Sequence, residues 1–190
     1  ISNTTSATMF STPVDVQRDS AIFFNPQILK EYDLPLPTTL PIFIQDVKTL
    51  YAHGIPFPIA GADGGWEATE LWTGLLLYYG GPKAIMALDY GTLNVSSPAV
   101  INATNTFNEL TQYNAPGAMA STWTTYIPEI SKGQVSFLVN GDWFDTFALT
   151  MISIPTYPAT APYTSWTNVT QMELPFPGTQ NYYMMCIDSI

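Results

Sequence analysis

The sequence predicts an α/β fold in which helices pack around a small central sheet. Residues 135–139 form an apolar, β-branched and aromatic run bounded by glycines, which is typical of a buried strand. Residues 40–53 space their apolar side chains three or four positions apart, which predicts an amphipathic helix. At 190 residues and 46% apolar content, the chain can bury one core. We therefore expect a single α/β domain over residues 1–190, with the apolar run as an inner strand and the helix packed across it.

The first part of the chain predicts short strands followed by helices. Residues 1–12 are small and polar and are expected to form a loop. Residues 13–17 and 21–25 are apolar enough for two short strands joined by a charged turn. Pro26 then begins a short helix, because proline is tolerated in a first helical turn. The amphipathic helix comes next and ends at Gly54.

The middle of the chain alternates loops with further helices. Residues 56–60 are a short strand candidate, and a glycine-rich loop over residues 61–65 follows. Helix signals run from residue 67 to 79 and stop at the Gly-Gly-Pro that follows. Two more helices are expected over residues 98–113 and 126–132, directly before the central strand.

The charge balance argues against a polyanionic partner. Fifteen acidic and five basic residues give a net charge of −10, which would repel nucleic acids and anionic membranes. Charged residues make up only 11% of the chain. A composition rich in uncharged polar residues suits a neutral polar ligand, although acidity alone can also serve solubility.

The sequence gives no reason to expect a metal or a cofactor. Cys186 and His53 are the single cysteine and the single histidine of the chain, so neither an internal disulfide nor a zinc cluster can be assembled. His53 stands before a glycine at the end of a helix, where it is expected to act as a C-cap. Cys186 lies in an apolar run and is expected to be a buried small side chain.

Four Asn-X-Ser/Thr sequons indicate a chain that is exported and glycosylated. They lie at Asn3, Asn94, Asn102 and Asn168, and none has proline in the middle position. A composition rich in Asn, Ser and Thr also produces some sequons by chance. The sequence shows neither a secretory leader nor a run long enough to span a bilayer. We therefore expect either that a leader has been removed or that the chain is an excised piece.

Two loop-to-helix junctions each pair a carboxylate with a tryptophan. One places Asp142 and Trp143 after the central strand, and the other places Asp63 before Trp66. Carboxylates accept hydrogen bonds from sugar hydroxyls, and a flat indole can cover the apolar face of a pyranose. Further candidates for ligand contact are Glu67, Asn140 and, more weakly, Trp123 on a later loop.

Each of these residues also has a purely structural explanation. Asp142 can cap a helix and Trp143 can be a core residue. Glu67 fits an acid that complements a helix N-terminus better than it fits a ligand contact. Asp63 is an ordinary turn residue, and the loop that carries Trp123 can simply pack over the core.

Three segments together resemble the extracellular solute-binding proteins of ABC sugar importers, the maltose-binding-protein-like family. They are residues 14–31 with 35–47, residues 60–81, and residues 133–143 with the later Leu-Pro-Phe-Pro-Gly at 174–178. The resemblance is to the second, C-terminal lobe of these proteins, a type II periplasmic-binding-protein-like fold. It implies that the chain is the excised second lobe of a two-lobed protein whose first lobe is missing here. Residues 13–17 and 173–179 would then cross the hinge, and the two chain ends would lie close together.

The resemblance implies binding without turnover. The chain would supply half of a sugar site, for glucose or a similar hexose or oligosaccharide, and would partner the missing lobe and the permease subunits of an ABC transporter. With the sequons, it favours the surface of an archaeal cell and a membrane-anchored parent. One alternative is a secreted glycoside hydrolase that uses Asp63 and Asp142 as its carboxylate pair. Another is a glycosylated surface interaction domain, which leaves the two tryptophan junctions unexplained.

Overall fold

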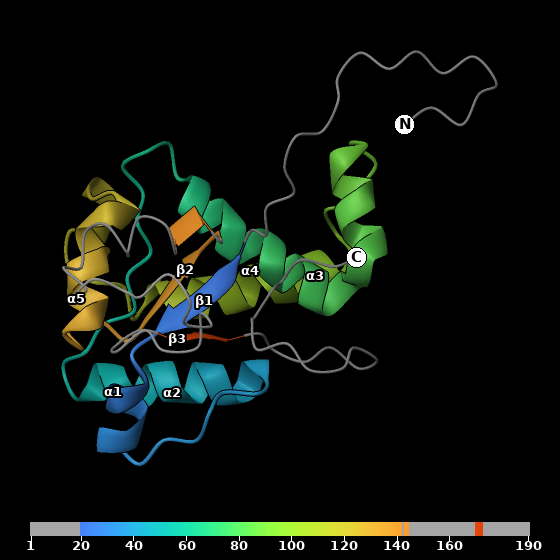
Figure 1. The fold of residues 1–190 in the computed structure, drawn as a ribbon. Coiled ribbons are helices and arrows are strands. Elements are labelled where there is room, and N and C mark those ends of the chain that lie inside the picture. The colour runs from blue at the N-terminus through green and yellow to red at the C-terminus, as the bar shows by residue number, and fades with distance from the viewer. Residues whose placement is uncertain (1–19, 142, 145–169, 173–190) are drawn as a thin grey trace, which may run out of the picture.

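The computed structural model describes residues 20–141, residues 143–144 and, for the backbone, residues 170–172 (Figure 1). Three strands form an antiparallel sheet in the order β2-β1-β3. The strands are β1 (Ala21–Phe24), β2 (Phe137–Asn140) and β3 (Thr170–Met172). The helices are α1 (Pro26–Glu31), α2 (Leu40–Ala52), α3 (Trp66–Asp89), α4 (Pro98–Thr111), the 3-10 helices η1 (Ala118–Ala120) and η2 (Trp123–Tyr126), and α5 (Ile127–Ser131).

Three of the helices begin in the same way, with a polar N-cap residue and a proline in the first turn. The N-cap side chains accept hydrogen bonds from backbone N–H groups that have no partner inside the helix. The caps are Asn25 for α1, Thr39 for α2 and Ser97 for α4. The helices predicted over residues 40–53 and 98–113 are therefore confirmed, and His53 is the C-cap of α2 as expected.

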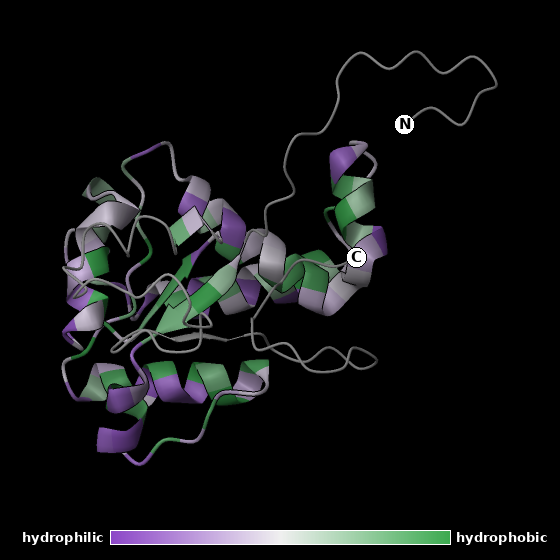
Figure 2. Cartoon of the chain, viewed as in Figure 1, coloured by the Kyte–Doolittle hydropathy of each residue, from purple (hydrophilic) through white to green (hydrophobic). Residues whose placement is uncertain are grey.

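Strands β1 and β2 are buried on both faces. On one face, Ile22, Phe24 and Phe137 pack with residues of α2, α3 and α4. On the other face, Phe23 and Leu138 pack with residues of η2 and α5. Figure 1 shows α2 and α5 on different sides of the strands, and Figure 2 shows both strands coloured as hydrophobic. Helices on both faces explain why these short strands are apolar along their whole length.

Strand β2 is buried, as predicted, but it is not central in the described sheet. Strand β1 lies in the middle of the order, with β2 on one side. The segment 56–60, predicted as a strand, runs past β2 without joining the sheet. Ser136 donates its backbone N–H to the carbonyl oxygen of Pro56 at 2.9 Å. Pro56 and Pro58 have no N–H groups of their own, so this segment cannot form a regular strand ladder.

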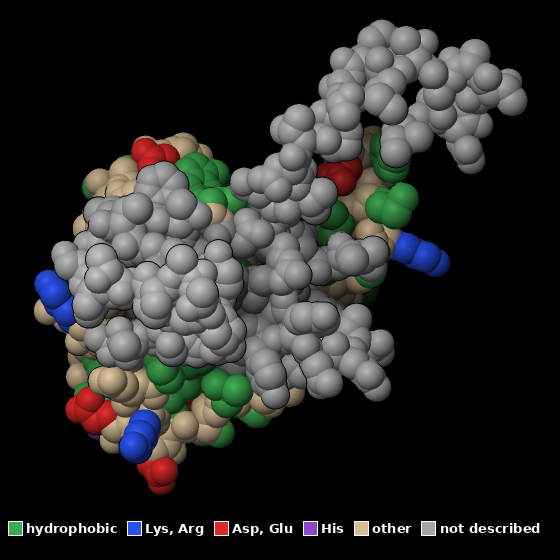
Figure 3. Space-filling model, viewed as in Figure 1, with side chains coloured by type: hydrophobic (Ala, Val, Ile, Leu, Met, Phe, Trp, Pro, Cys, Tyr) green, Lys and Arg blue, Asp and Glu red, His purple; other side chains and the backbone are tan. Residues whose placement is uncertain are grey.

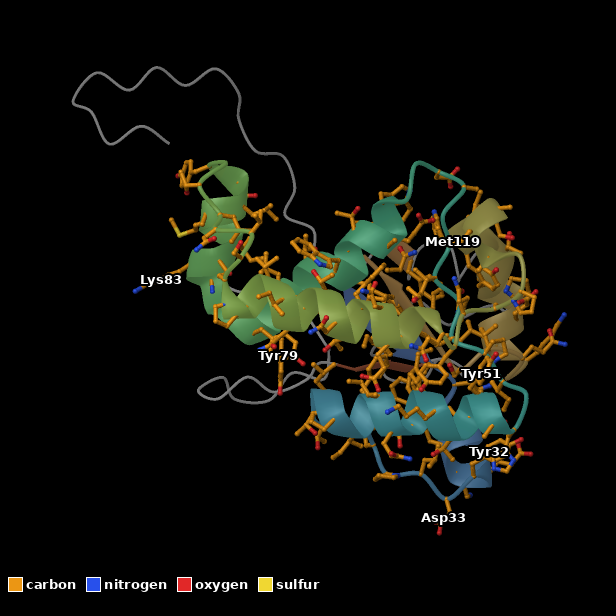
Figure 4. The ribbon with its side chains drawn as sticks, turned by 180° about the vertical axis from the view of Figure 1, so that it is seen from behind. Tyr32, Asp33, Tyr51, Tyr79, Lys83 and Met119 are labelled. Carbon is orange, nitrogen blue, oxygen red and sulfur yellow. The ribbon has the colours of Figure 1, made fainter. Side chains whose placement is uncertain are left out.

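Helix α3 continues beyond the position where the sequence predicts its end. The backbone breaks at Gly81, which has φ 65° and ψ −175°, and a second helical part runs on to Asp89. Glycine adopts this conformation readily, and Pro82 fits the first turn of the second part. Figure 4 shows Tyr79 near the bend and Lys83 on the part that extends away from the strands. A Gly-Gly-Pro sequence thus bends this helix instead of ending it.

Several predictions lie outside the described residues. They concern the loop over residues 1–12, the hinge-crossing segments 13–17 and 173–179 with the proximity of the two chain ends, and the burial of Cys186. Within the described part of the chain, no helix is long and apolar enough to cross a membrane.

Candidate ligand-binding site

Three loops meet at one end of the described sheet. The glycine loop over residues 61–65 leads into α3, a second loop leads through η1 to η2, and a third leaves the end of β2. The first two are joined directly, because the backbone N–H groups of Gly61 and Ala62 donate to the carbonyl oxygen of Ser121 at 3.3 and 3.2 Å. Residues far apart in the sequence are thereby brought to one surface.

Three tryptophans stand directly after these loops: Trp66 is the first residue of α3, Trp123 is the first residue of η2, and Trp143 follows the end of β2. The ring centroids of Trp66 and Trp123 lie 6.3 Å apart, and those of Trp66 and Trp143 lie 5.9 Å apart. Trp123 is only 8% exposed. Trp66 and Trp143 are half-buried and pack against the apolar cluster that contains Trp123 and Phe144. The structure thus brings together Trp66 and Trp143, the tryptophans of the two junctions.

The glycine loop approaches its neighbour very closely at Gly61. A Cβ atom at this position would lie 2.8 Å from Met119 Cε and 3.0 Å from the Met119 carbonyl oxygen. Figure 4 shows Met119 on its loop, at the opposite end of the domain from Lys83. Only glycine leaves room for this contact, because part of the obstacle is backbone that cannot turn aside.

Glu67 is buried in the first turn of α3. Its Oε1 atom accepts a hydrogen bond from the backbone N–H of Trp123 at 3.3 Å, and its side chain is 3% exposed. Burial raises the pKa of this carboxyl, the hydrogen bonds from backbone N–H groups of Glu67 and Trp123 oppose the rise, and the nearby Asp63 adds to it. The geometry matches the structural explanation of Glu67, an acid held at a helix N-terminus.

Asn140 and Asp63 lie in opposite environments. Asn140 is fully buried at the end of β2, and its Oδ1 atom accepts from the backbone N–H of Gly141 at 2.9 Å. Its Nδ2 atom has no hydrogen-bond partner within the described part of the chain. Asp63 is exposed to solvent on the glycine loop. Asp142 lies outside the described residues.

The enclosed space beside this surface is too small for a sugar ring. A pocket between the segment 57–60, Glu67 and Trp123 has a volume of about 10 Å³. That is room for about one water molecule.

Metal-ligating side chains are not clustered in the described part of the chain. No group of three or more His, Cys, Asp or Glu residues that could hold a metal ion occurs there. His53 is engaged at the end of α2, where its ring stacks on Tyr32 with centroids 4.7 Å apart. On the face drawn in Figure 3, the charged side chains are scattered and form no patch.

Two of the four sequons can be placed. Asn94 is exposed in the turn between α3 and α4, and Asn102 is exposed on α4. Asn3 and Asn168 lie outside the described residues. A glycan at either described position would extend into solvent without disturbing the core.

Comparison with known proteins gives the family. The model of the family "Bacterial extracellular solute-binding protein" matches residues 2–186. The chain belongs to this family.

Two curated relatives come from archaea. The chain is 40% identical to the glucose-binding protein GlcS of Saccharolobus solfataricus over 188 residues, which is 96% of this chain and 34% of the relative. It is 25% identical to an uncharacterised ABC transporter extracellular-binding protein of Pyrococcus horikoshii, over 70% of this chain and 31% of that protein. The chain therefore spans about a third of the length of the curated relatives it matches.

Solved structures of similar fold support the same fold class. A structure described under xylan utilisation by Caldanaerobius polysaccharolyticus matches with a TM-score of 0.68 at 18% identity, covering 84% of this chain and 39% of that one. The solute receptor AcbH matches with a TM-score of 0.62 at 20% identity, covering 70% of this chain and 34% of that one. The predicted type II periplasmic-binding-protein-like α/β fold is confirmed.

Residues that hold the loops together carry almost no signal in the sequence. Asn114 accepts from the backbone N–H of Ile59 at 2.8 Å and donates to the Ile59 carbonyl oxygen at 3.2 Å. Ser121 and Gly61 join the loops through their backbones. Gly61 lies between two alanines, which is a weak sequence signal for close packing. The contacts of Ser121 are made by its backbone and therefore have no sequence signal.

Proposed function

We propose that the chain is the carbohydrate-binding lobe of an extracellular solute-binding protein that delivers sugar to an ABC transporter. The observation that carries this proposal is the contact between Trp66, the first residue of α3, and Trp143, which follows the end of β2; both residues are only half-buried. Indoles held in this way offer a rigid apolar surface for the face of a pyranose. Asp63, and Asp142 beside Trp143, are proposed to accept hydrogen bonds from the hydroxyl groups.

The proposed ligand is glucose or a similar neutral hexose or oligosaccharide. The 40% identity to a glucose-binding protein supports this choice, as does the scarcity of charge. We propose that Glu67 and Asn140 support the site from beneath, because both are buried and accept hydrogen bonds from backbone N–H groups. Trp123 is proposed to back the two outer indoles.

We propose binding without hydrolysis. The family is one of solute-binding proteins, and a glycosidase would need two carboxyl groups across a cleft, one of them with a raised pKa. Glu67 is the acid at this end with a raised pKa, but it is buried and bonded to the backbone. No observation favours the alternative of a surface interaction domain.

The remaining parts of the proposal concern the whole protein. A second lobe closes on the sugar by hinge motion, and permease subunits receive it at the membrane. The protein works outside the cell, anchored to the membrane, with glycans on its sequons. The family name supports the extracellular location, and the exposure of Asn94 and Asn102 supports glycans at these two positions.

Calorimetry with neutral hexoses tests the proposal. The full-length protein should bind glucose or a related sugar with a dissociation constant of about 1 μM, which corresponds to about −8 kcal/mol. The isolated chain should bind it no more tightly than about 1 mM, because roughly half the contacts are lost. A full-length protein that binds no neutral sugar would refute the proposed function. A charged solute such as citrate serves as the control and should not bind.

A further inference from the structure

We propose that Glu67 is a positioning residue that fixes the Trp123 loop against the start of α3 and so sets the spacing of the tryptophans at the ligand surface. The inference rests on the proposed function for its consequence in binding. Its structural part stands on contacts between described residues alone.

The link between Glu67 and Trp123 joins two distant parts of the chain. The Oε1 atom of Glu67 accepts from the backbone N–H of Trp123, across 56 positions of sequence, in a buried setting. Removing the carboxylate would leave the buried amide of Trp123 without this acceptor, and an unsatisfied buried donor costs free energy. This bond therefore fixes the position of the first residue of η2.

The same carboxylate serves the start of α3. The N-cap residue of α3 is Gly65, which has no side chain to accept from the first N–H groups of the helix. Glu67 lies in this first turn and supplies negative charge where the helix dipole is positive. Trp66 is the residue immediately before Glu67, so one side chain holds the helix start that carries Trp66 and the loop that carries Trp123.

The second carboxylate oxygen of Glu67, Oε2, lies in the same buried region as Trp123. Oε2 is buried and has no hydrogen-bond partner among the described residues. Glu67 also lines the pocket that has room for about one water molecule, together with Trp123. A water bound there would satisfy Oε2 without placing the carboxylate in contact with a sugar. This geometry separates Glu67 from Asp63, which is exposed on the glycine loop.

Hydrogen exchange at the Trp123 amide in the ligand-free full-length protein tests the link directly. Glu67→Ala should accelerate this exchange by about tenfold or more, because the acceptor is lost. Glu67→Gln keeps an acceptor oxygen and should restore most of the protection. Glu70→Ala is the matched control, since Glu70 is another buried acid one turn further along α3, and it should leave the Trp123 amide unchanged.

A second variant covers the case in which Glu67→Ala does not fold. Glu67→Asp keeps the charge at the helix start but shortens the side chain by one methylene, so it cannot reach the Trp123 N–H without displacement. Its Trp123 amide should also exchange faster than in the wild type. Unchanged exchange at Trp123 in a folded Glu67→Ala or Glu67→Asp protein would overturn the proposal.

Glucose titration of the same proteins tests the consequence for binding. Glu67→Ala should weaken binding by about tenfold, and Glu67→Gln should bind within about threefold of the wild type. Faster exchange with unchanged affinity would overturn the role of Glu67 in the site. A wild type that binds no neutral sugar would instead refute the proposed function, while the exchange experiment still decides whether Glu67 holds the loop.

Discussion

The indole rings of Trp66 and Trp143 lie 5.9 Å apart and are inclined by 59° to each other. Trp66 is the first residue of α3, and Trp143 follows the end of β2. A helix start and a strand end thus present their aromatic side chains together. This pair is the basis of the first prediction.

Replacing Trp143 with alanine should weaken sugar binding in the full-length protein without unfolding it. Loss of a stacked indole is expected to raise the free energy of binding by about 1 to 3 kcal/mol, roughly fivefold to 150-fold in affinity. Calorimetry measures the effect, and circular dichroism checks the fold. Trp72→Phe is the control. Trp72 packs against the apolar cluster on the opposite face of the strands, which contains Phe24 and Phe137, and it donates its Nε1–H to Thr104. Wild-type affinity in Trp143→Ala would mean that Trp143 is only a core residue.

Replacing Gly61 with alanine should separate the first two loops. The added Cβ meets both the side chain and the backbone of Met119, so the free energy of unfolding should fall by about 1 to 3 kcal/mol. Sugar affinity should fall as well, because the loop leads to Trp66. Denaturant unfolding and calorimetry measure the two effects.

The double variant Gly61→Ala with Met119→Ala distinguishes the two obstacles. It removes the Met119 Cε atom but leaves the Met119 carbonyl oxygen, which would lie 3.0 Å from the new Cβ. Stability should therefore remain below that of the Met119→Ala single variant. Equal stability of these two variants would show that the backbone approach is unimportant.

Asp46 should make the stability of the protein fall as the pH rises from about 4 to 7. Its side chain is 2% exposed, and burial raises its pKa from 3.8 to about 6. Between these two values the folded state holds a proton that the unfolded state has released, so folding is favoured at the lower pH. The contribution is present below pH 3.8, is lost as the pH rises toward about 6, and amounts to about 2 to 3 kcal/mol.

Asp46→Asn tests this pH dependence, because it removes the titrating group and nearly keeps the shape. The free energy of unfolding is measured by denaturant titration at pH 4 and pH 7.5 for both proteins. From pH 4 to pH 7.5, the free energy of unfolding of the wild type should fall relative to that of Asp46→Asn. A difference between the two proteins that does not change with pH would contradict the expected titration of Asp46.

Local sequence signals predicted the helices well. Helices α2 and α4 carry regular apolar spacing and clear cap residues, and β1 and β2 carry apolar runs. The bend at Gly81 was not predictable in this way, because Gly-Gly-Pro is compatible both with a helix end and with a second helical segment. The order of the strands depends on contacts between distant segments, which no local pattern contains.

The candidate site was predictable only as a set of residue types. The pairing of carboxylates with indoles pointed to Asp63, Trp66 and Trp143. The contact between Trp66 and Trp143 follows from the arrangement of the loops. The burial of Glu67 and Asn140 could not be predicted, because acidic and amide side chains near loops are usually exposed.

The most direct test of the account is an NMR titration of the full-length protein, labelled with 15N at its indole nitrogens, with glucose. The Nε1–H signals of Trp66 and Trp143 should shift on addition of sugar, because the proposed ligand lies against these two rings. The signal of Trp72 should not shift. Its Nε1–H donates a hydrogen bond to Thr104, and its ring packs against the apolar cluster on the opposite face of the strands. Unmoved signals of Trp66 and Trp143 in a protein that demonstrably binds glucose would contradict the account.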